Sequence, residues 1–440
     1  MCLSERKNNT TMSERKMIYL CLAHMSEDKM EEKYVQEAFD TNWVVPMGPN
    51  VNAFEKDLEA FVNTAEDNAP SNRRVVCLSA GTAAVHLALI ACGVKAGDEV
   101  CVQSFTFCAS SNPITYLGAK PVFIDSEPTT WNMDPALLEK AIIDRKEKTG
   151  RYPKAIIPVA LYGMPYDSER IMAVADKYGI PVIEDAAEGM GSRFGGRVLG
   201  TFGRFGVLSF NGNKMITTSG GGALICRSDE DANNIMWYAT QARDAYPYYE
   251  HTAVGYNYRM SNVCAGIGRG QMTVLERHIA HHKHVQALYE TLLSDVQGVH
   301  VHKQPDDKRY DSNFWLCAAT IDPEVHVKGQ EKAYKDVIKT AVGGAAGVIK
   351  KVDNATTDCQ PNDNVEALRL FMLDKKVECR PLWKPMHKQP VYADAVSYTN
   401  GVSESLFKVG FCLPSGPCVS DDDVHYIVEM IKDAICEESK

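Results

Sequence analysis

Several features that define other classes of protein are missing from this chain of 440 residues. No apolar run approaches the length of about 18 residues that a membrane-spanning helix needs, and residues 1–16 lack the apolar core of a signal peptide. The formal net charge of −10 predicts no basic surface for nucleic acid or an anionic membrane. The 14 cysteines form no C-x-x-C pair and commonly lie among apolar residues, as reduced thiols do. We therefore expect a cytoplasmic protein with no nucleic-acid, membrane or metal partner.

The order of apolar patterns along the chain predicts the fold class. Short β-branched runs alternate with helical patterns up to about residue 271, which predicts an α/β domain whose parallel or mixed sheet is covered by helices on both faces. A long helix (Val274 to Asp295), further strands and a C-terminal helix (Asp422 to Ile435) then predict a smaller α+β domain. We expect a disordered tail at residues 1–16, a large domain at 17–271 and a small domain at 272–440.

The stretch from Leu208 to Ala223 carries a chemical signal. Lys214 lies between two short apolar runs, Phe205–Phe210 and Gly222–Cys226, that are typical of buried strands. A lysine held in a turn at the edge of a rigid core can act as a nucleophile toward carbonyl groups. The glycines at 220–222 would let a flat cofactor approach the backbone. Taken alone, a surface lysine in a glycine-rich hairpin explains this stretch equally well.

Two upstream segments favour the chemical interpretation. Asp185 follows the β-branched run Ile180–Ile183, at the end of a strand where α/β sheets bind ligands, and a carboxylate there can pair with the pyridine nitrogen of pyridoxal 5'-phosphate (PLP). Gly81 and Thr82 follow another strand and open a helix, whose N-terminus can bind a phosphate. Each signal is weak alone, but the three in this order predict a PLP site.

The chain resembles the DegT/DnrJ/EryC1/StrS family of PLP-dependent sugar aminotransferases. The resemblance runs from about Ile18 to about Ile435 and rests on the motifs above and on the segments 42–50, 118–125, 255–261 and 380–387. It implies the type I, aspartate aminotransferase-like fold. The segment Arg380-Pro-Leu-Trp-Lys-Pro-Met-His387 is similar to the branch that moves an amino group from L-glutamate to C4 of UDP-linked 4-keto-6-deoxy-N-acetylhexosamines. That branch makes bacillosamine-type sugars for cell-surface polysaccharides and glycans.

The resemblance also implies roles around the cofactor. Lys214 would hold PLP as a Schiff base and move a proton, and Asp185 would pair with the pyridine nitrogen. Ser209 would bind the phosphate together with the Gly81 and Thr82 backbone. Phe107 would stack on the pyridine ring.

One position departs from the commonest family pattern. Glu188 stands where many relatives have Gln or His near the 3-oxygen of the ring. The resemblance therefore implies its location at the cofactor, but a carboxylate beside a phenolate would repel it unless it is protonated or bridged by water.

Further positions imply a substrate site and a partner. Asn257 and Arg259 align with a loop that relatives contribute from the neighbouring subunit, Asn to the PLP phosphate and Arg near the nucleotide, which implies a homodimer with shared sites. Lys384 and His387 would line the sugar and pyrophosphate site, or would simply lie in a solvated loop.

Other functions remain open at this point. The substrate could be a dTDP- or GDP-linked ketosugar or a ketocyclitol. A PLP-bound dehydratase of this fold would be expected to have histidine in place of Lys214, and a non-catalytic PLP-binding protein would be expected to lose Lys214 or Asp185.

Residues 325–362 exceed the family pattern, and we expect an insertion there with a helix at Gln330–Ala341 and a glycine-rich loop at Gly343–Gly347.

Overall fold

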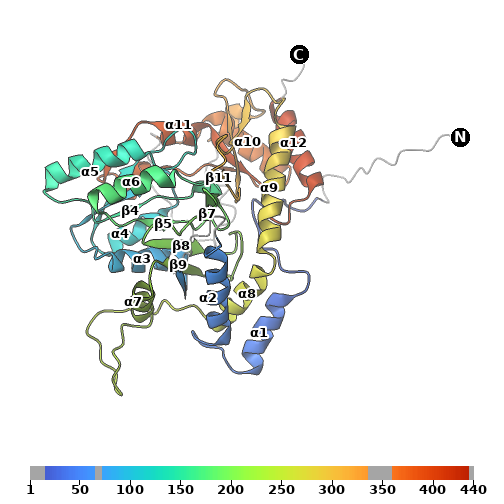
Figure 1. The fold of residues 1–440 in the computed structure, drawn as a ribbon. Coiled ribbons are helices and arrows are strands. Elements are labelled where there is room, and N and C mark those ends of the chain that lie inside the picture. The colour runs from blue at the N-terminus through green and yellow to red at the C-terminus, as the bar shows by residue number, and fades with distance from the viewer. Residues whose placement is uncertain (1–14, 65–71, 335–358, 436–440) are drawn as a thin grey trace, which may run out of the picture.

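The computed structural model describes residues 15–64, 72–334 and 359–435 (Figure 1). A central sheet is built from two sets of four strands. One set has the order β14-β3-β2-β4 and is parallel throughout. The other has the order β1-β9-β8-β5, in which β9 runs antiparallel to both neighbours and β5 runs parallel to β8. The parallel bridges Ile156–Val182 and Val159–Asp185 join the two sets, which confirms the predicted mostly parallel sheet.

The strands of this sheet are short. Their bounds are β1 (Arg74–Leu78), β2 (Glu99–Gln103), β3 (Lys120–Ile124), β4 (Ala155–Ile157), β5 (Ile183–Asp185), β8 (Phe205–Ser209), β9 (Gly222–Cys226) and β14 (Val396–Tyr398). Strand β5 begins later than the predicted run at Ile180, because Pro181 has no N–H to donate to a neighbouring strand. Asp185 is consequently the last residue of the strand, paired with Val207 of β8.

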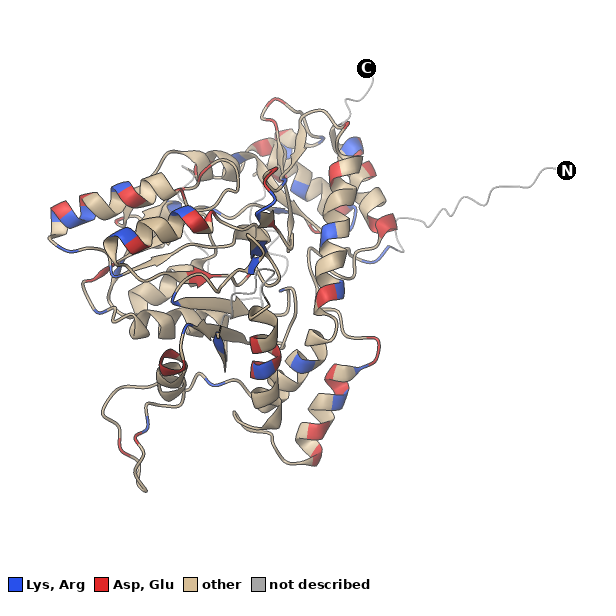
Figure 2. Ribbon diagram, viewed as in Figure 1, with Lys and Arg blue, Asp and Glu red and all other residues tan. Residues whose placement is uncertain are grey.

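Helices cover both faces of the sheet. Along β1, Val76 and Leu78 pack in the core with α3 and α7, whereas Val75 and Cys77 pack with α2. Helices α5 and α6 pack over β2 and β3 (Figure 1). The helices of this part are α1 (Met30–Asp40), α2 (Pro49–Val62), α3 (Gly81–Ala91), α4 (Asn112–Tyr116), α5 (Pro135–Thr149), α6 (Ser168–Tyr178), α7 (Asp229–Ala239) and α8 (Asn262–Met272). Both signs of charge are mixed along α1 and α5 (Figure 2).

The second part of the sequence builds an antiparallel sheet of order β10-β12-β15-β13, which shares a core with α9, α10 and α12. The bounds are α9 (Leu275–Leu292), β10 (Val299–Val301), β12 (Cys317–Ile321), α10 (Asp363–Asp374), β13 (Arg380–Pro381), α11 (Val402–Val409), β15 (Gly410–Leu413) and α12 (Asp421–Ile435). A small sheet combines β6 (Arg193–Phe194) and β7 (Arg197–Val198) of the first part of the sequence with β11 (Tyr310–Asp311) of the second part. Strand β14 returns to the central sheet, so the two predicted domains share it.

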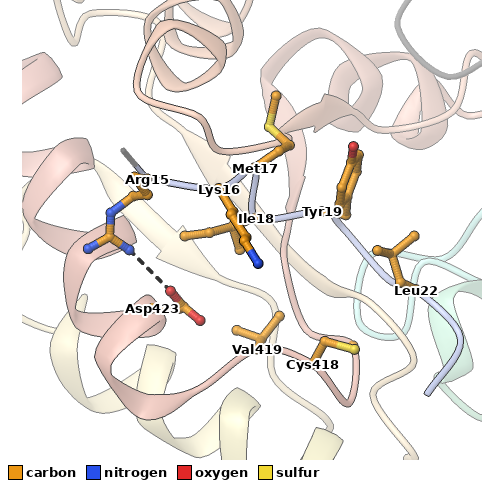
Figure 3. A pocket seen from close by; sticks show the side chains of 10 residues that line it. Arg15, Lys16, Met17, Ile18, Tyr19, Leu22, Cys418, Val419 and Asp423 are labelled. Carbon is orange, nitrogen blue, oxygen red and sulfur yellow. Dashed lines mark hydrogen bonds and ion pairs between the residues drawn. The ribbon is translucent and has the colours of Figure 1, made fainter. Parts of the chain in front are cut away.

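The segment before α1 crosses the C-terminal part. Ile18 forms a parallel bridge with Val377, and Arg15 pairs with Asp423 at 3.2 Å. A pocket of about 260 Å³ lies beside this segment, and Cys418 is part of its wall (Figure 3).

Some expectations fall on residues without a description. The loop at Gly343–Gly347 lies outside the described residues, and so does most of the expected helix Gln330–Ala341, apart from a short 3-10 turn at Gln330–Lys332. The expected tail is described only for residues 15 and 16. The insertion at 325–362 and the tail therefore stay predictions. Across the described ranges, no helix is both long enough and apolar enough to span a bilayer.

Candidate active site

The site lies where the central strands end. Because β5 and β8 are parallel, their last residues, Asp185 and Ser209, reach the same edge of the sheet. The turn that carries Lys214 leaves this edge directly after β8. This is the edge at which open α/β sheets bind ligands.

One end of the site has the features of a phosphate cradle. Strand register places Leu78 and Ser209 on either side of Gly222, and α3 begins three residues after Leu78. Gly222 packs against the backbone at Gly81, where any side chain would collide. The residue before α3, Ala80, offers no side-chain cap, so the first N–H groups of the helix can bind an anion beside the Ser209 hydroxyl. Thr82 lies in the same half-buried first turn.

Asp185 provides a buried carboxylate at the same edge. Its side chain accepts hydrogen bonds from the Ser110 hydroxyl at 2.6 Å and from the backbone N–H of Ala187 at 3.2 Å. Burial raises the pKa of Asp185, and the Lys214 charge opposes that rise less strongly. An added cationic partner would therefore be favourable here.

Lys214 has two neighbours that the sequence did not indicate together. Its Nζ lies 3.2 Å from the Glu188 carboxylate and 4.0 Å above the ring of Trp315. The carboxylate and the ring face both favour a cation, and the lysine side chain is mostly shielded from solvent.

Glu188 is buried beside this lysine. Its second oxygen accepts the backbone N–H of Tyr162 at 2.7 Å. Burial raises the pKa of Glu188 to about 7, while Lys214 and the Tyr162 N–H act in the opposite direction. Near neutral pH this carboxyl can therefore hold a proton or release it within hydrogen-bonding distance of the Lys214 amine.

These residues fit PLP. The Lys214 amine can bind an aldehyde, the buried Asp185 carboxylate suits a protonated pyridine nitrogen, and the start of α3 with Ser209 suits a phosphate. Phe107 is 54% exposed at the same end of the sheet, although it is a large apolar side chain, and its ring centre lies 5.5 Å from that of Trp383. An aromatic face left open in this way is available for stacking on a ligand.

The two expected substrate residues, His387 and Lys384, differ in how far they are buried. The side chain of His387 is only 5% exposed, with Nδ1 at 2.6 Å from the Ser104 hydroxyl and Nε2 at 3.2 Å from Glu404. It therefore fastens its segment to the end of β2. Lys384 is half-buried in the same segment, next to Trp383.

The two residues expected from a partner subunit differ in their surroundings. Asn257 is exposed, as a residue that reaches another subunit would be. The guanidinium of Arg259 instead pairs with Glu55 of its own chain and donates to the Cys77 carbonyl at 2.9 Å. The structure thus brings together Gly81, Ser209, Asp185, Glu188 and Lys214, while the roles of Asn257 and Arg259 stay predictions.

Three further residues at the site were missed by sequence reasoning. Trp315 contacts Lys214, Tyr162 contacts Glu188, and Ser110 contacts Asp185. Ser110 stands in the hydroxyl-rich stretch 104–111, which could have indicated it, but no pattern in the sequence pointed to Trp315 or Tyr162. Among the described residues, no group of three or more His, Cys, Asp or Glu side chains could hold a metal ion.

A lysine, a buried carboxylate and an uncapped helix start at one sheet edge define a PLP-dependent enzyme of type I fold. Comparison with known proteins identifies the family. Its model, described as the DegT/DnrJ/EryC1/StrS aminotransferase family, matches residues 25–345 and 351–432, and the chain belongs to that family.

Individual relatives extend this result. The chain is 40% identical over 420 residues to EpsN of Bacillus subtilis, a protein named as a pyridoxal phosphate-dependent aminotransferase, with 94% of this chain and 95% of that one covered. It is 32% identical over 417 residues to a GDP-perosamine synthase of Escherichia coli O157:H7, covering 95% and 99%. The crystal structure of a family member from Brucella abortus has the same fold, with a TM-score of 0.77 at 24% identity and coverage of 93% and 96%. The chain is a PLP-dependent aminotransferase.

Proposed function

We propose that the chain transfers an amino group from L-glutamate to C4 of a UDP-linked 4-keto-6-deoxy-N-acetylhexosamine, for the synthesis of cell-surface polysaccharide or glycan. The observation that carries the proposal is the position of the segment Arg380–His387. The backbone N–H of Trp383 donates to the Tyr162 hydroxyl at 2.9 Å, and the N–H of Met386 donates to the Ser104 carbonyl at 2.8 Å. The segment that resembles this branch of the family therefore lies against the lysine site.

The protein's own groups have separable tasks in this reaction. When bound, PLP supplies the carbonyl that takes up the amino group and the ring that withdraws electrons. Lys214 binds the cofactor and delivers a proton to C4 of the sugar from the face it occupies. Glu188 exchanges that proton with the lysine amine, 3.2 Å away. Lys384 and His387 lie in the segment that would meet the sugar and pyrophosphate.

A single-turnover comparison tests the substrate. The enzyme is first converted by glutamate to its pyridoxamine form, and UDP-, dTDP- and GDP-linked 4-keto-6-deoxy sugars are then added separately. We expect the visible absorbance of the lysine-bound cofactor to return at least about ten-fold faster with the UDP-N-acetyl compound, because one favourable polar contact to the correct substrate is worth about 1.4 kcal/mol. Product NMR identifies the carbon that is aminated.

The GDP-linked sugar is the second candidate, because the relative from Escherichia coli is named as a GDP-perosamine synthase. A faster return with a GDP- or dTDP-linked sugar would overturn the UDP assignment and leave the aminotransferase activity intact. If the absorbance did not return with any ketosugar in the panel, both the UDP assignment and the aminotransferase activity on these sugars would be contradicted.

We also propose that two copies of the chain form a homodimer in which Asn257 completes the partner's site. Mixing two inactive variants, Lys214→Ala and Asn257→Ala, should then restore about a quarter of the parent's activity, because half of the randomly formed dimers contain one intact site out of two.

The matched control for this mixture pairs Lys214→Ala with Asp185→Asn, whose residues belong to the same copy of the site. That mixture should stay inactive. No recovery in the first mixture, with subunit exchange shown by differently tagged chains, would mean that each chain builds its own site.

A further inference from the structure

Two buried histidines on α9 contact the backbone on either side of the lysine site. His278 and His282 lie one helical turn apart and are 2% and 0% exposed. The Nδ1 of His278 lies 3.2 Å from the carbonyl oxygen of Met215, and the Nδ1 of His282 lies 3.2 Å from that of Phe314. Each carbonyl belongs to a neighbour of a residue already placed in the site: Met215 follows Lys214, and Phe314 precedes Trp315.

The same two segments are also bonded directly to each other. The indole N–H of Trp315 donates to the carbonyl of Asn213 at 2.7 Å, and Nζ of Lys214 lies above the Trp315 ring. The contacts thus form a closed ring of interactions, from α9 through the lysine turn to Trp315 and back to α9. We call this set of contacts the histidine brace, and it consists of His278, His282, the Met215 and Phe314 carbonyls, and the bond from Trp315 to Asn213.

The chemistry of the contacts defines the state of both imidazoles. A carbonyl oxygen can only accept, so each Nδ1 must carry the proton and donate it. Within the described residues, neither Nε2 atom has a hydrogen-bond partner. Burial lowers the pKa of both side chains, that of His282 to about 3, so both rings stay neutral at physiological pH and keep a single donor aimed at the backbone.

The brace acts on a segment that needs support. Phe314 has a φ of 48°, in the left-handed region that side chains other than glycine rarely adopt. Its carbonyl direction is set by that conformation and is met by His282. Loss of this donor would leave the Phe314 carbonyl without this partner and would free the adjoining Trp315 to move.

We propose that His278 and His282 are positioning residues that hold the Lys214 turn and the Trp315 ring in register, so that the lysine amine stays between the ring and Glu188. Neither histidine touches the amine itself. The inference rests on the proposed role of Lys214 as the cofactor lysine, but the brace can be tested without that role.

The decisive measurement is the reactivity of the Lys214 amine. Full-length protein without cofactor is treated with a small amine-reactive reagent, and the labelling rate of Lys214 is followed by mass spectrometry. The variants His278→Leu and His282→Leu should label about five-fold faster, because a lysine released from the Trp315 ring face becomes more accessible to the reagent than the parent side chain, which is 14% exposed. His282→Asn should return the rate to within about two-fold of the parent, since its amide can donate from nearly the same place as Nδ1.

His284 supplies the matched control on the same helix. Its side chain is 55% exposed and contacts Asp421 at the surface, so His284→Leu should label at the parent's rate. Equal rates in the parent and both buried-histidine leucine variants, or failure of His282→Asn to restore the rate, would overturn the proposal.

A second measurement uses the unchanged protein and does not depend on whether a leucine variant folds. In protein with selectively ¹⁵N-labelled histidine, the signals of His278 and His282, among the 12 imidazoles of each chain, should both be those of a neutral ring protonated on Nδ1 at physiological pH. Their signals are assigned by loss in His278→Asn and His282→Asn. A proton on Nε2 of either ring would contradict the brace. If Lys214→Ala still bound the cofactor covalently, the proposed function would fail, whereas the labelling and NMR results would stand independently.

Discussion

Lys214→Ala is expected to abolish transamination, with a fall of at least about 10⁴-fold in kcat, and to remove the visible absorbance of bound cofactor at the same time. The reason is that the same amine binds the cofactor and carries the proton to the sugar carbon. The measurement is a glutamate-dependent turnover assay together with an absorbance spectrum of the purified variant incubated with PLP.

The variant Lys214→Arg keeps the positive charge of the side chain but removes the amine. An arginine could still pair with Glu188 and lie on the Trp315 ring, but it has no amine that can bind an aldehyde at neutral pH. We therefore expect Lys214→Arg to be as inactive as Lys214→Ala, while Lys283→Ala, at a surface ion pair with Asp311, keeps full activity. Borohydride treatment of the parent should fix the cofactor on Lys214, and a peptide labelled at another lysine would refute the assignment.

Much of this site could be predicted because its parts are local in the sequence. The Lys214 turn follows a strand within a few residues, and the helix start at Gly81 follows another, so apolar pattern and turn chemistry were sufficient to locate them. Asp185 was found in the same way, although the strand around it was placed too early because the missing N–H of Pro181 was not considered.

The contacts that set the behaviour of the lysine are not local. Trp315 stands 101 positions after Lys214 in the chain numbering, and the two segments meet where α9 contacts both Met215 and Phe314. A buried tryptophan has no pattern that distinguishes contact with a lysine from ordinary packing. The same applies to His278 and His282, whose spacing along α9 is that of any two residues on one helical face.

Glu188 shows what the structure adds to a residue that the sequence did locate. Its alignment near the cofactor implied repulsion from a phenolate unless the carboxyl were protonated. Burial raises its pKa to about 7, so a substantial fraction is protonated at neutral pH, and the fraction falls as the pH rises through that value. The apparent conflict with the family pattern is therefore reduced by the surroundings of the side chain.

Asp185→Asn should have the next largest effect. It removes the charge and, because an amide NH2 can only donate, reverses the direction of the hydrogen bond with the Ser110 hydroxyl. The amide has nearly the same shape, and it can still accept the Ala187 N–H that Asp185 accepts at 3.2 Å. It cannot, however, stabilise a proton on the pyridine nitrogen. Removing one partner of a buried ion pair costs about 3–5 kcal/mol, which corresponds to a fall of about 10²- to 10⁴-fold in kcat.

The stability of the variant should change in the opposite direction from its activity. In the folded protein without cofactor, burial raises the pKa of Asp185 above the value of about 3.9 that an unfolded chain has, so above that pH the ionised carboxylate lowers the free energy of unfolding. At pH 8 we therefore expect cofactor-free Asp185→Asn to melt at or above the temperature of the parent. The rise in melting temperature on adding PLP should be smaller in the variant, because the charge pair that cofactor binding creates is missing.

Asp125 is the matched control for this comparison. It is a buried carboxylate at the end of β3 that accepts the backbone N–H groups of Asn400, Gly401 and Ser403, so its charge serves the fold and not the lysine site. Asp125→Asn should lower the melting temperature of the cofactor-free protein but leave the rise on PLP addition unchanged. If Asp185→Asn behaved in the same way as Asp125→Asn, with a lower melting temperature and a full response to PLP, Asp185 would be a structural carboxylate. If Asp185→Asn instead melted at or above the temperature of the parent and responded less to PLP, the buried charge of Asp185 would destabilise the free protein. Pairing of that charge with the pyridine nitrogen would then offset this cost.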